Sequence, residues 1–443
     1  MKKKTVKESV FTKLSYVFIA LMLTVFLFYF NSTGYSGITE AKLPVFRALC
    51  GGYVILNIIL IPACLVTGLI KTDDIKRKIS ELTAAQKLAA VFMLLTVLSS
   101  LLSDFSPRTW QGVSRYEGTI TVCTYCLCFI FLSSFGRIKK WMPYLLGVSV
   151  LAFCALCIVQ LCGKNPFSLY PEGMNFYDAG TEYNGQYLGT IGNTDLTAAF
   201  FCIVIPLLSA AVIRMKGKTR FLLLVPLTAS LFVLLKMSVL AGLLGVFAGM
   251  VLSLPVLLPL SDKRAKQLML LIAILLLLCV LLVFFADSDV GMLHEAHELL
   301  HGRADESFGS GRVYIWKNVL ERVPEHLMFG SGPDTMILSG IDPFTRFDAD
   351  KNVNITAEID TAHNEYLNIL FHQGIFALLA YLALLVVLAV KWIRQGRKSN
   401  AAAAAGTAVL CYCIQAFFGI SMFLTAPFYW MTLGLLDSSL RIT

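Results

Sequence analysis

The run LMLLIAILLLLCVLLVFFA, from Leu268 to Ala286, decides the class of fold. It contains no charged residue, and as a helix it is long enough to cross a hydrocarbon core of about 30 Å. Similar apolar runs recur along the 443 residues. A transmembrane β-barrel would instead show short segments of alternating hydrophobicity. We therefore expect an all-α, polytopic membrane protein.

The overall composition excludes most other classes of protein. Hydrophobic residues make up 57% of the chain and charged residues 15%, with a mean hydropathy of +0.72. Soluble domains carry about 25% charged residues, so an ordinary cytosolic or disordered protein does not fit. The twelve cysteines lie within or at the ends of apolar runs, which favours packing over a disulfide framework.

The hydropathy pattern predicts about twelve transmembrane helices. We place them roughly at residues 14–30, 46–70, 86–102, 119–135, 142–162, 196–213, 221–235, 238–260, 268–286, 366–390, 401–420 and 426–440. The seventh and eighth form a tight hairpin around Lys236. The chain then divides into helices one to nine (1–286), a large extracytoplasmic loop domain (287–365) and helices ten to twelve (366–443).

The positive charges predict the orientation of these spans. Of the 37 Lys and Arg residues, 25 fall in alternate connecting segments that share one side of the membrane if the N-terminus is cytoplasmic. Because basic residues are enriched in cytoplasmic segments, both termini are expected in the cytoplasm. The net charge of +9 then follows from the membrane topology, and we expect membrane lipids rather than nucleic acid as its partner.

The segment 287–365 carries 15 of the 28 acidic residues and five of the six histidines. Loops of this length are usually functional or disordered, and its aromatic residues favour a folded one. We predict a short helix over Met292–Leu300 and an amphipathic helix over Gly311–Glu325. The spacing places four side chains on one apolar face of the second helix, namely Val313, Trp316, Leu320 and Val323.

Two residues of this loop suit chemistry on a phosphate-bearing substrate. Arg312 follows Gly309-Ser310-Gly311 at a predicted helix start, where free N–H groups also favour an anion. His363 lies just before the tenth span, where its imidazole could take a proton from a hydroxyl, oriented by Asp360 or Glu365. A solvated arginine and a structural histidine would give the same local sequences.

Other polar residues are open to more than one interpretation. His294, His297 and His301 have a spacing compatible with a metal site, although a solvated amphipathic stretch explains it as well. Lys236 lies at the outer boundary of its hairpin, where it could snorkel or bind an anion. Two further outer clusters are Asp104–Gly118, which contains Arg115, and the aromatic-rich Gly163–Asp195.

Four motifs together resemble the O-antigen ligase and polysaccharide polymerase family of bacterial cytoplasmic membranes. They are His363-Asn364-Glu365-Tyr366-Leu367 with Gly374, Ser310-Gly311-Arg312 to Trp316 with Gly330-Ser331-Gly332, Gly189-Thr190-Ile191-Gly192-Asn193, and Gly112 to Gly118 with Arg115. They span residues 110–390 in the expected order, and the combination of His-Asn with Arg-Trp is the most specific part.

The resemblance implies an enzyme that moves a glycan from a polyprenyl-diphosphate donor to an acceptor hydroxyl on the outer face, without a metal or other cofactor. The acceptor would be a glycan, a lipid or a cell-wall polymer. Arg312 would contact the diphosphate and His363 would activate the acceptor. Further substrate-binding residues are expected to be Lys236, Arg115, Arg303, Trp316, Asn364, Glu365 and Tyr366.

The chain departs from the family pattern at Val239, where an arginine is usual in a Ser-Arg pair. Lys236, Arg115 or Arg303 could supply the second phosphate contact, although a lysine is a point charge and lacks the planar fork of an arginine.

Two other classes remain open from the sequence. A transporter or flippase of lipid-linked sugars would need charged or broken helices at the bilayer midplane. A structural subunit of an envelope assembly would need neither Arg312 nor His363.

Overall fold

A computed structural model describes residues 9–170, 189–286, 291–348 and 353–441 of the chain. Within these residues, eight helices are long and apolar enough to cross a membrane. They are Gly34–Val66, Ala84–Leu102 (α5), Met142–Leu161 (α8), Thr194–Arg214 (α9), Lys218–Met237, Leu240–Leu257 (α11), Asp262–Phe285 (α12) and Glu365–Lys398. Three shorter apolar helices are Val10–Phe26, Thr119–Phe135 (α7) and Asn400–Ala416 (α16), and α17 (Ala426–Arg441) ends the bundle.

The protein is therefore an all-α, polytopic membrane protein. Eleven of the twelve predicted spans overlap one of these apolar helices, and the twelfth overlaps α17. The second span begins earlier than predicted, at Gly34, because α2 (Ile38–Phe46) and α3 (Gly52–Val66) continue one another through a π-helical turn. The hairpin at the seventh and eighth spans is also confirmed. There α10 (Leu224–Met237) and α11 are separated by Ser238 in the left-handed conformation.

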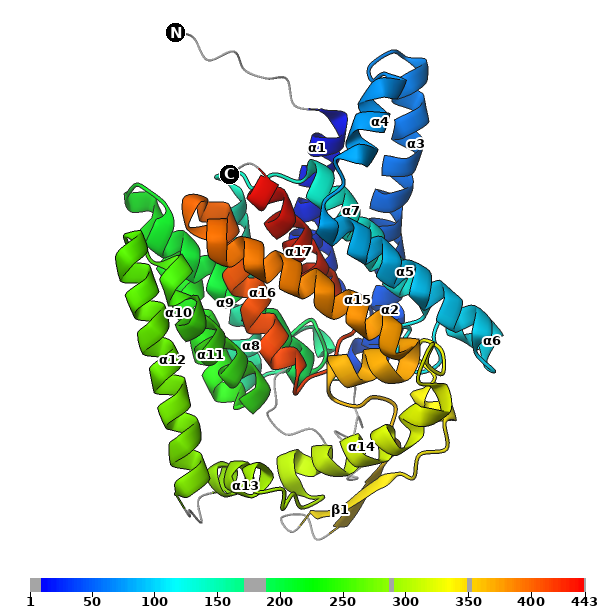
Figure 1. Cartoon of the computed structure of the whole chain (residues 1–443), viewed down its shortest axis with the longest axis vertical. Helices are drawn as coiled ribbons and strands as arrows, with labels where there is room; N and C mark the ends of the chain where they lie inside the picture. Colours follow the sequence, from blue (N-terminus) through cyan, green and yellow to red (C-terminus); the bar gives the residue numbers. More distant parts are fainter. Residues whose placement is uncertain (1–8, 171–188, 287–290, 349–352, 442–443) are drawn as a thin grey trace.

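Burial divides the helices into a core and a periphery. Helices α9, α16 and α17 are buried along most of their length. By contrast, only 6% of the residues in the most apolar stretch of α12 are buried by protein. In Figure 1, α12 accordingly stands at one edge of the bundle. A helix that is apolar on all sides and unburied by protein presents those side chains to lipid.

The helix α15 (Glu365–Gln395) is broken near its start. Gly374 has a φ of 83°, and a Cβ there would collide with the Met328 carbonyl. The freed main-chain groups bond to the segment 327–332 instead: Ser331 N–H donates to Phe371 O (2.9 Å), and Ile375 N–H donates to Leu327 O (2.8 Å). The break therefore fixes this extramembrane segment to the membrane helix.

The connection from α12 to α15 lies across one end of the bundle (Figure 1). It contains α13 (Gly291–Leu300), α14 (Phe308–Arg322) and a two-stranded antiparallel sheet of β1 (Phe344–Asp348) and β2 (Val353–Ala357). Both predicted helices are confirmed, whereas the sheet was not predicted. A second small apolar core joins α14 to α15 through Val319, Ile359 and Phe371.

The predicted apolar face of α14 is wrong in one respect. The buried side chains are Ile315, Val319 and Val323, whereas Leu320 is 52% exposed and Trp316 is half-buried. The helix has two adjacent apolar faces: the first is buried, and the second, with Trp316 and Leu320, is partly exposed.

Candidate functional site

The site begins with the loop between α5 and α7, which the Asp334 carboxylate holds in place. Asp334 accepts hydrogen bonds from the Ser114 N–H (3.1 Å), the Ser114 hydroxyl (2.9 Å) and the Arg115 N–H (2.9 Å). Gly112 has a φ of 92°, and a Cβ there would collide with Asp334. The main chain of Arg115 is thus fixed to the segment that follows Gly332.

The Arg115 side chain makes a fork-to-fork contact with Asp360. Its Nε donates to Asp360 Oδ2 at 2.8 Å, and its Nη2 donates to Asp360 Oδ1 at 2.9 Å. Both side chains are about one-quarter exposed. This planar, two-bond geometry is the one in which arginine also binds phosphate.

His363 lies close enough to Arg115, Asp360 and Arg312 for the charge of each to act on its imidazole. It has a φ of 49°, directly before Asn364, whose side chain caps α15 by accepting from the N–H groups of Tyr366 and Leu367. Burial, together with the charges of Arg115 and Arg312, lowers the pKa of His363 to about 4, while Asp360 acts in the opposite direction. At neutral pH the imidazole is uncharged, so it can accept a proton.

Arg312 is presented by a left-handed turn. Gly309, Ser310 and Gly311 all have positive φ, and a Cβ at Gly311 would collide with the Phe344 ring. The guanidinium donates to Phe418 O (3.1 Å) and Gly309 O (2.8 Å). No described carboxylate lies within ion-pair distance of it, so its positive charge remains available to an anion.

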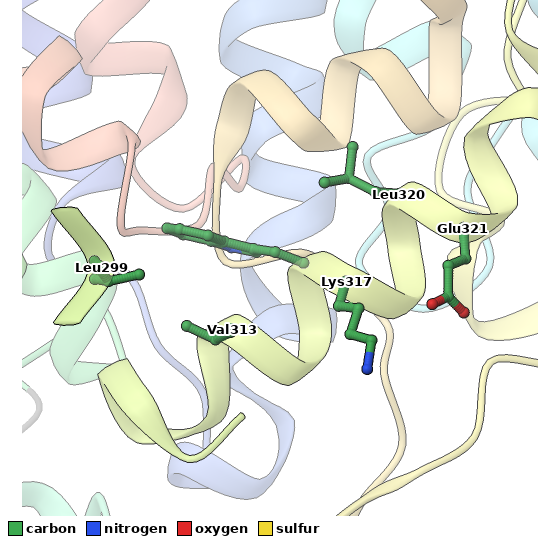
Figure 2. A pocket seen from close by; sticks show the side chains of 6 residues that line it. Leu299, Val313, Lys317, Leu320 and Glu321 are labelled. Atoms are coloured by element: carbon green, nitrogen blue, oxygen red, sulfur yellow. The ribbon is translucent and has the colours of Figure 1, made fainter. Parts of the chain in front are cut away.

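The exposed apolar face of α14 continues from Arg312. Trp316, one helical turn later, donates from Nε1 to Ala362 O (2.8 Å) and packs against Phe417 and Phe418. It borders a pocket of about 480 Å³, whose other lining residues are Leu299, Val313, Lys317, Leu320 and Glu321. Figure 2 shows that Leu320 points toward the bundle, whereas Lys317 and Glu321 point away from it. The result is a largely apolar groove along α14, and Val313 in its lining directly follows Arg312 in the chain.

A smaller cavity of about 70 Å³ lies behind the Arg115–Asp360 pair, and its lining includes Glu117 and Glu365. The Tyr125 hydroxyl donates to Glu117, and the Tyr381 hydroxyl donates to Glu365 (both 2.8 Å). Burial raises the pKa of Glu117 to about 8. Two buried polar atoms in its lining, His372 Nε2 and Gln373 Oε1, have no hydrogen-bond partner among the described residues. Such a lining suits ordered water.

The structure places the predicted site residues in two groups. Arg115, Arg312, Trp316, His363, Asn364 and Glu365 gather at one end of the bundle. Tyr366 is close to them, with its hydroxyl bonded to Cys413 O (2.8 Å). By contrast, Arg303 is paired with Glu298 (2.7 Å) on α13, and Lys236 is exposed at the end of α10.

The remaining motifs have structural roles, as far as the described residues show. Gly189 and Gly192 both have positive φ, and a Cβ at these positions would collide with Phe153 and Ile38, respectively. Asn193 caps α9. His297 and His301 bond main-chain carbonyls, and no cluster of metal-ligating side chains occurs in the described ranges. The aromatic cluster predicted within Gly163–Asp195 lies largely at 171–188, outside those ranges.

Three contributors to the site were not predicted from the sequence. Asp334 and Glu117 were not assigned roles, and neither was the main chain at Phe418. Glu117 directly before an apolar helix is the one local signal that could have drawn attention. Asp334 bonds to a residue 219 positions away, for which a single sequence carries no sign.

Comparison with known families gives one result. Residues 222–382 match the family model described as O-antigen ligase. The matched region includes Arg312, Trp316, Asp360 and His363, whereas Arg115 lies outside it. No curated protein matches the chain significantly.

Proposed function

We propose that the chain, whose residues 222–382 match the O-antigen ligase family model, is a ligase- or polymerase-type membrane enzyme that transfers a glycan from a polyprenyl-diphosphate donor to an acceptor hydroxyl. The observation that carries this proposal is the arrangement of two guanidinium groups around an uncharged imidazole, beside an apolar groove. Each part of such a donor then has a matching surface.

The donor's diphosphate would bind between Arg312 and Arg115. Among the described residues, the Arg312 guanidinium donates only to main-chain carbonyls, so it can also bind an anion directly. The polyprenyl chain would follow the groove past Trp316 to Leu320 and Leu299. Arg115 would supply the second phosphate contact. It would thereby replace the arginine that the family pattern has at the position of Val239. Lys236 and Arg303, which lie apart from this cluster, are weaker candidates.

The acceptor hydroxyl would approach His363. Its oxygen bonds to the anomeric carbon of the glycan while the bond from that carbon to the diphosphate breaks. The hydroxyl proton passes to the imidazole, and the negative charge that develops on the departing lipid diphosphate is stabilised by the two arginines. Asn364 and Glu365 would hold the segment that carries His363, since both begin α15.

We also propose that the segment 287–365 is an extracytoplasmic domain of a bacterial cytoplasmic-membrane protein, with both termini in the cytoplasm. The basic connecting segments support this orientation. The first residue of α1 (Val10–Leu21) and the last of α17 lie at the end of the bundle opposite α14 (Figure 1). The acceptor would be a glycan, a lipid or a cell-wall polymer on that outer side.

The test uses purified full-length protein in detergent with a synthetic lipid-diphosphate sugar and a range of acceptors. We expect wild-type protein to release lipid diphosphate and to form the glycosylated acceptor. His363→Ala and Arg312→Ala should each lower the rate by about 100-fold or more. Arg322→Ala and His326→Ala are matched controls, because both side chains are exposed near the end of the same helix. Wild-type rates in folded His363→Ala and Arg312→Ala would refute these roles.

A further inference from the structure

The carboxylate of Asp360 occupies the fork of Arg115 in the geometry that a phosphate would take. Both guanidinium bonds are short, and they run in parallel to the two carboxylate oxygens. Both side chains are about one-quarter exposed, so an incoming anion can reach the pair. A diphosphate brings more charge and more acceptor oxygens to the same fork. Donor binding at Arg115 therefore competes with Asp360.

The main chain around Asp360 is held independently of Arg115. Ala362 N–H donates to Asn368 Oδ1, and Asn368 Nδ2 donates to the Thr361 hydroxyl (both 2.8 Å). Ala362 O accepts from Trp316. On the other side, Asp334 holds the main chain of Arg115. Separation of the pair thus requires only a rotation of side chains.

Resting on the proposed function, we propose that Asp360 is an exchangeable positioning residue. The donor's diphosphate displaces its carboxylate from Arg115, and the released carboxylate then orients His363 and stabilises its protonated form. His363 follows Asp360 by three residues, and the charge of Asp360 already acts on its imidazole. Binding of the donor and activation of the base become one event.

The charges around His363 give this exchange its direction. In the structure, Arg115 and Arg312 both lower the pKa of His363, and Asp360 alone of the three groups raises it. A bound diphosphate would compensate both arginines and free the Asp360 carboxylate. All of these changes raise the pKa of His363, so the histidine becomes a stronger base only when the donor is present.

The experiment measures binding and turnover of full-length Asp360→Asn and Asp360→Glu, with Asp342→Asn as an exposed control in the same connection. Farnesyl diphosphate, which carries no glycan to transfer, is the binding probe. We expect Asp360→Asn to bind it about five- to tenfold more tightly, since the competing carboxylate is gone. Its kcat with a lipid-diphosphate sugar should fall about 10- to 100-fold, and Asp360→Glu should recover part of that loss.

The pH dependence gives a readout that a merely structural role would not move. In wild type, the acidic limb of kcat should lie at higher pH than that of kcat/KM, because the bound donor raises the pKa of His363. In Asp360→Asn the two limbs should move closer together. If the acidic limbs of kcat and kcat/KM lie at the same pH in wild type, the proposal is overturned.

Binding of farnesyl diphosphate by Arg312→Ala separates the proposed donor site from the proposed exchange of Asp360. If both Arg312→Ala and Asp360→Asn weaken farnesyl diphosphate binding, the donor site stands, but Asp360 only supports Arg115 and the exchange is refuted. If wild-type protein does not bind the probe, the proposed function and the exchange both fail. Tighter binding by Asp360→Asn together with weaker binding by Arg312→Ala supports both.

Discussion

Glu117 lies between the loop that holds Arg115 and the apolar helix α7, and it is a buried carboxyl group whose titration should be visible in stability. Burial raises its pKa to about 8, and the nearby charges of Asp334 and Glu365 act in the same direction. The folded protein therefore binds this proton more tightly than the unfolded chain does. The resulting stabilisation is complete below about pH 4.5 and is lost as the pH rises to about 8.

Glu117→Gln should remove this dependence, because the amide stays neutral. Wild-type stability should fall by about 2 kcal/mol between pH 6 and pH 8 relative to the variant, with no further divergence above about pH 9. Thermal unfolding in detergent at pH 5, 6, 7, 8 and 9 measures the difference in Tm. Glu81→Gln, at an exposed glutamate, is the control. Parallel Tm curves for wild type and Glu117→Gln would show that Glu117 titrates normally.

The sequence predicted the residues of the site better than their pairings. Arg312 and His363 stand in local patterns, a glycine turn before a helix and a polar segment before a span, and the structure brings both to one place. The partners of Arg115 are 219 and 245 positions away. Contacts at such separations depend on how the bundle packs, and one sequence does not encode them in any local pattern.

At the scale of elements, α14 carries a packed face and the proposed donor groove side by side, so their contributions to stability and to donor binding can be tested separately. Val319 is fully buried in the small core against α15, whereas Leu320 is 52% exposed and borders the groove. Val319→Ala should lower stability by about 2 kcal/mol with little change in KM for the donor. Leu320→Ala should change stability by less than about 0.5 kcal/mol.

The proposed polyprenyl chain gives Leu320→Ala its own signature. Loss of apolar contact in the groove should raise the KM for a long-chain donor about threefold or more, with a smaller effect on a short-chain donor. Steady-state kinetics with the two donors measures the change in KM, and Tm measures the change in stability. An unchanged long-chain KM would place the lipid elsewhere.

Elements were predictable where a single physical rule decides them. Length and hydropathy place the spans, since a segment that crosses lipid must hydrogen-bond all of its own main-chain groups, which a helix does. The break at Gly374 follows a different rule, because the freed groups are satisfied by the segment 327–332. The β1–β2 sheet has two short strands in the connection between α12 and α15. No long apolar pattern marks such strands in the sequence.

At the scale of the whole molecule, the distribution of charge and the position of the site support one orientation. The described ends of the chain lie at one end of the bundle and the α14 connection at the other (Figure 1). The basic connecting segments alternate with this connection, which carries most of the acidic residues. In this orientation, the proposed donor site at the acidic, histidine-rich end would face the outside of the cell.

Cysteine labelling in intact cells tests this orientation. Asp342→Cys and Ser80→Cys place thiols at exposed positions on the two ends, in a Cys162→Ser background that removes an exposed native thiol. A membrane-impermeant maleimide should label Asp342→Cys in intact cells, and Ser80→Cys only after permeabilisation, because the basic segment around Ser80 is expected inside. The opposite pattern would put Arg312 and His363 on the cytoplasmic side. The proposed acceptor would then have to be a cytoplasmic one, and the extracytoplasmic reaction would be excluded.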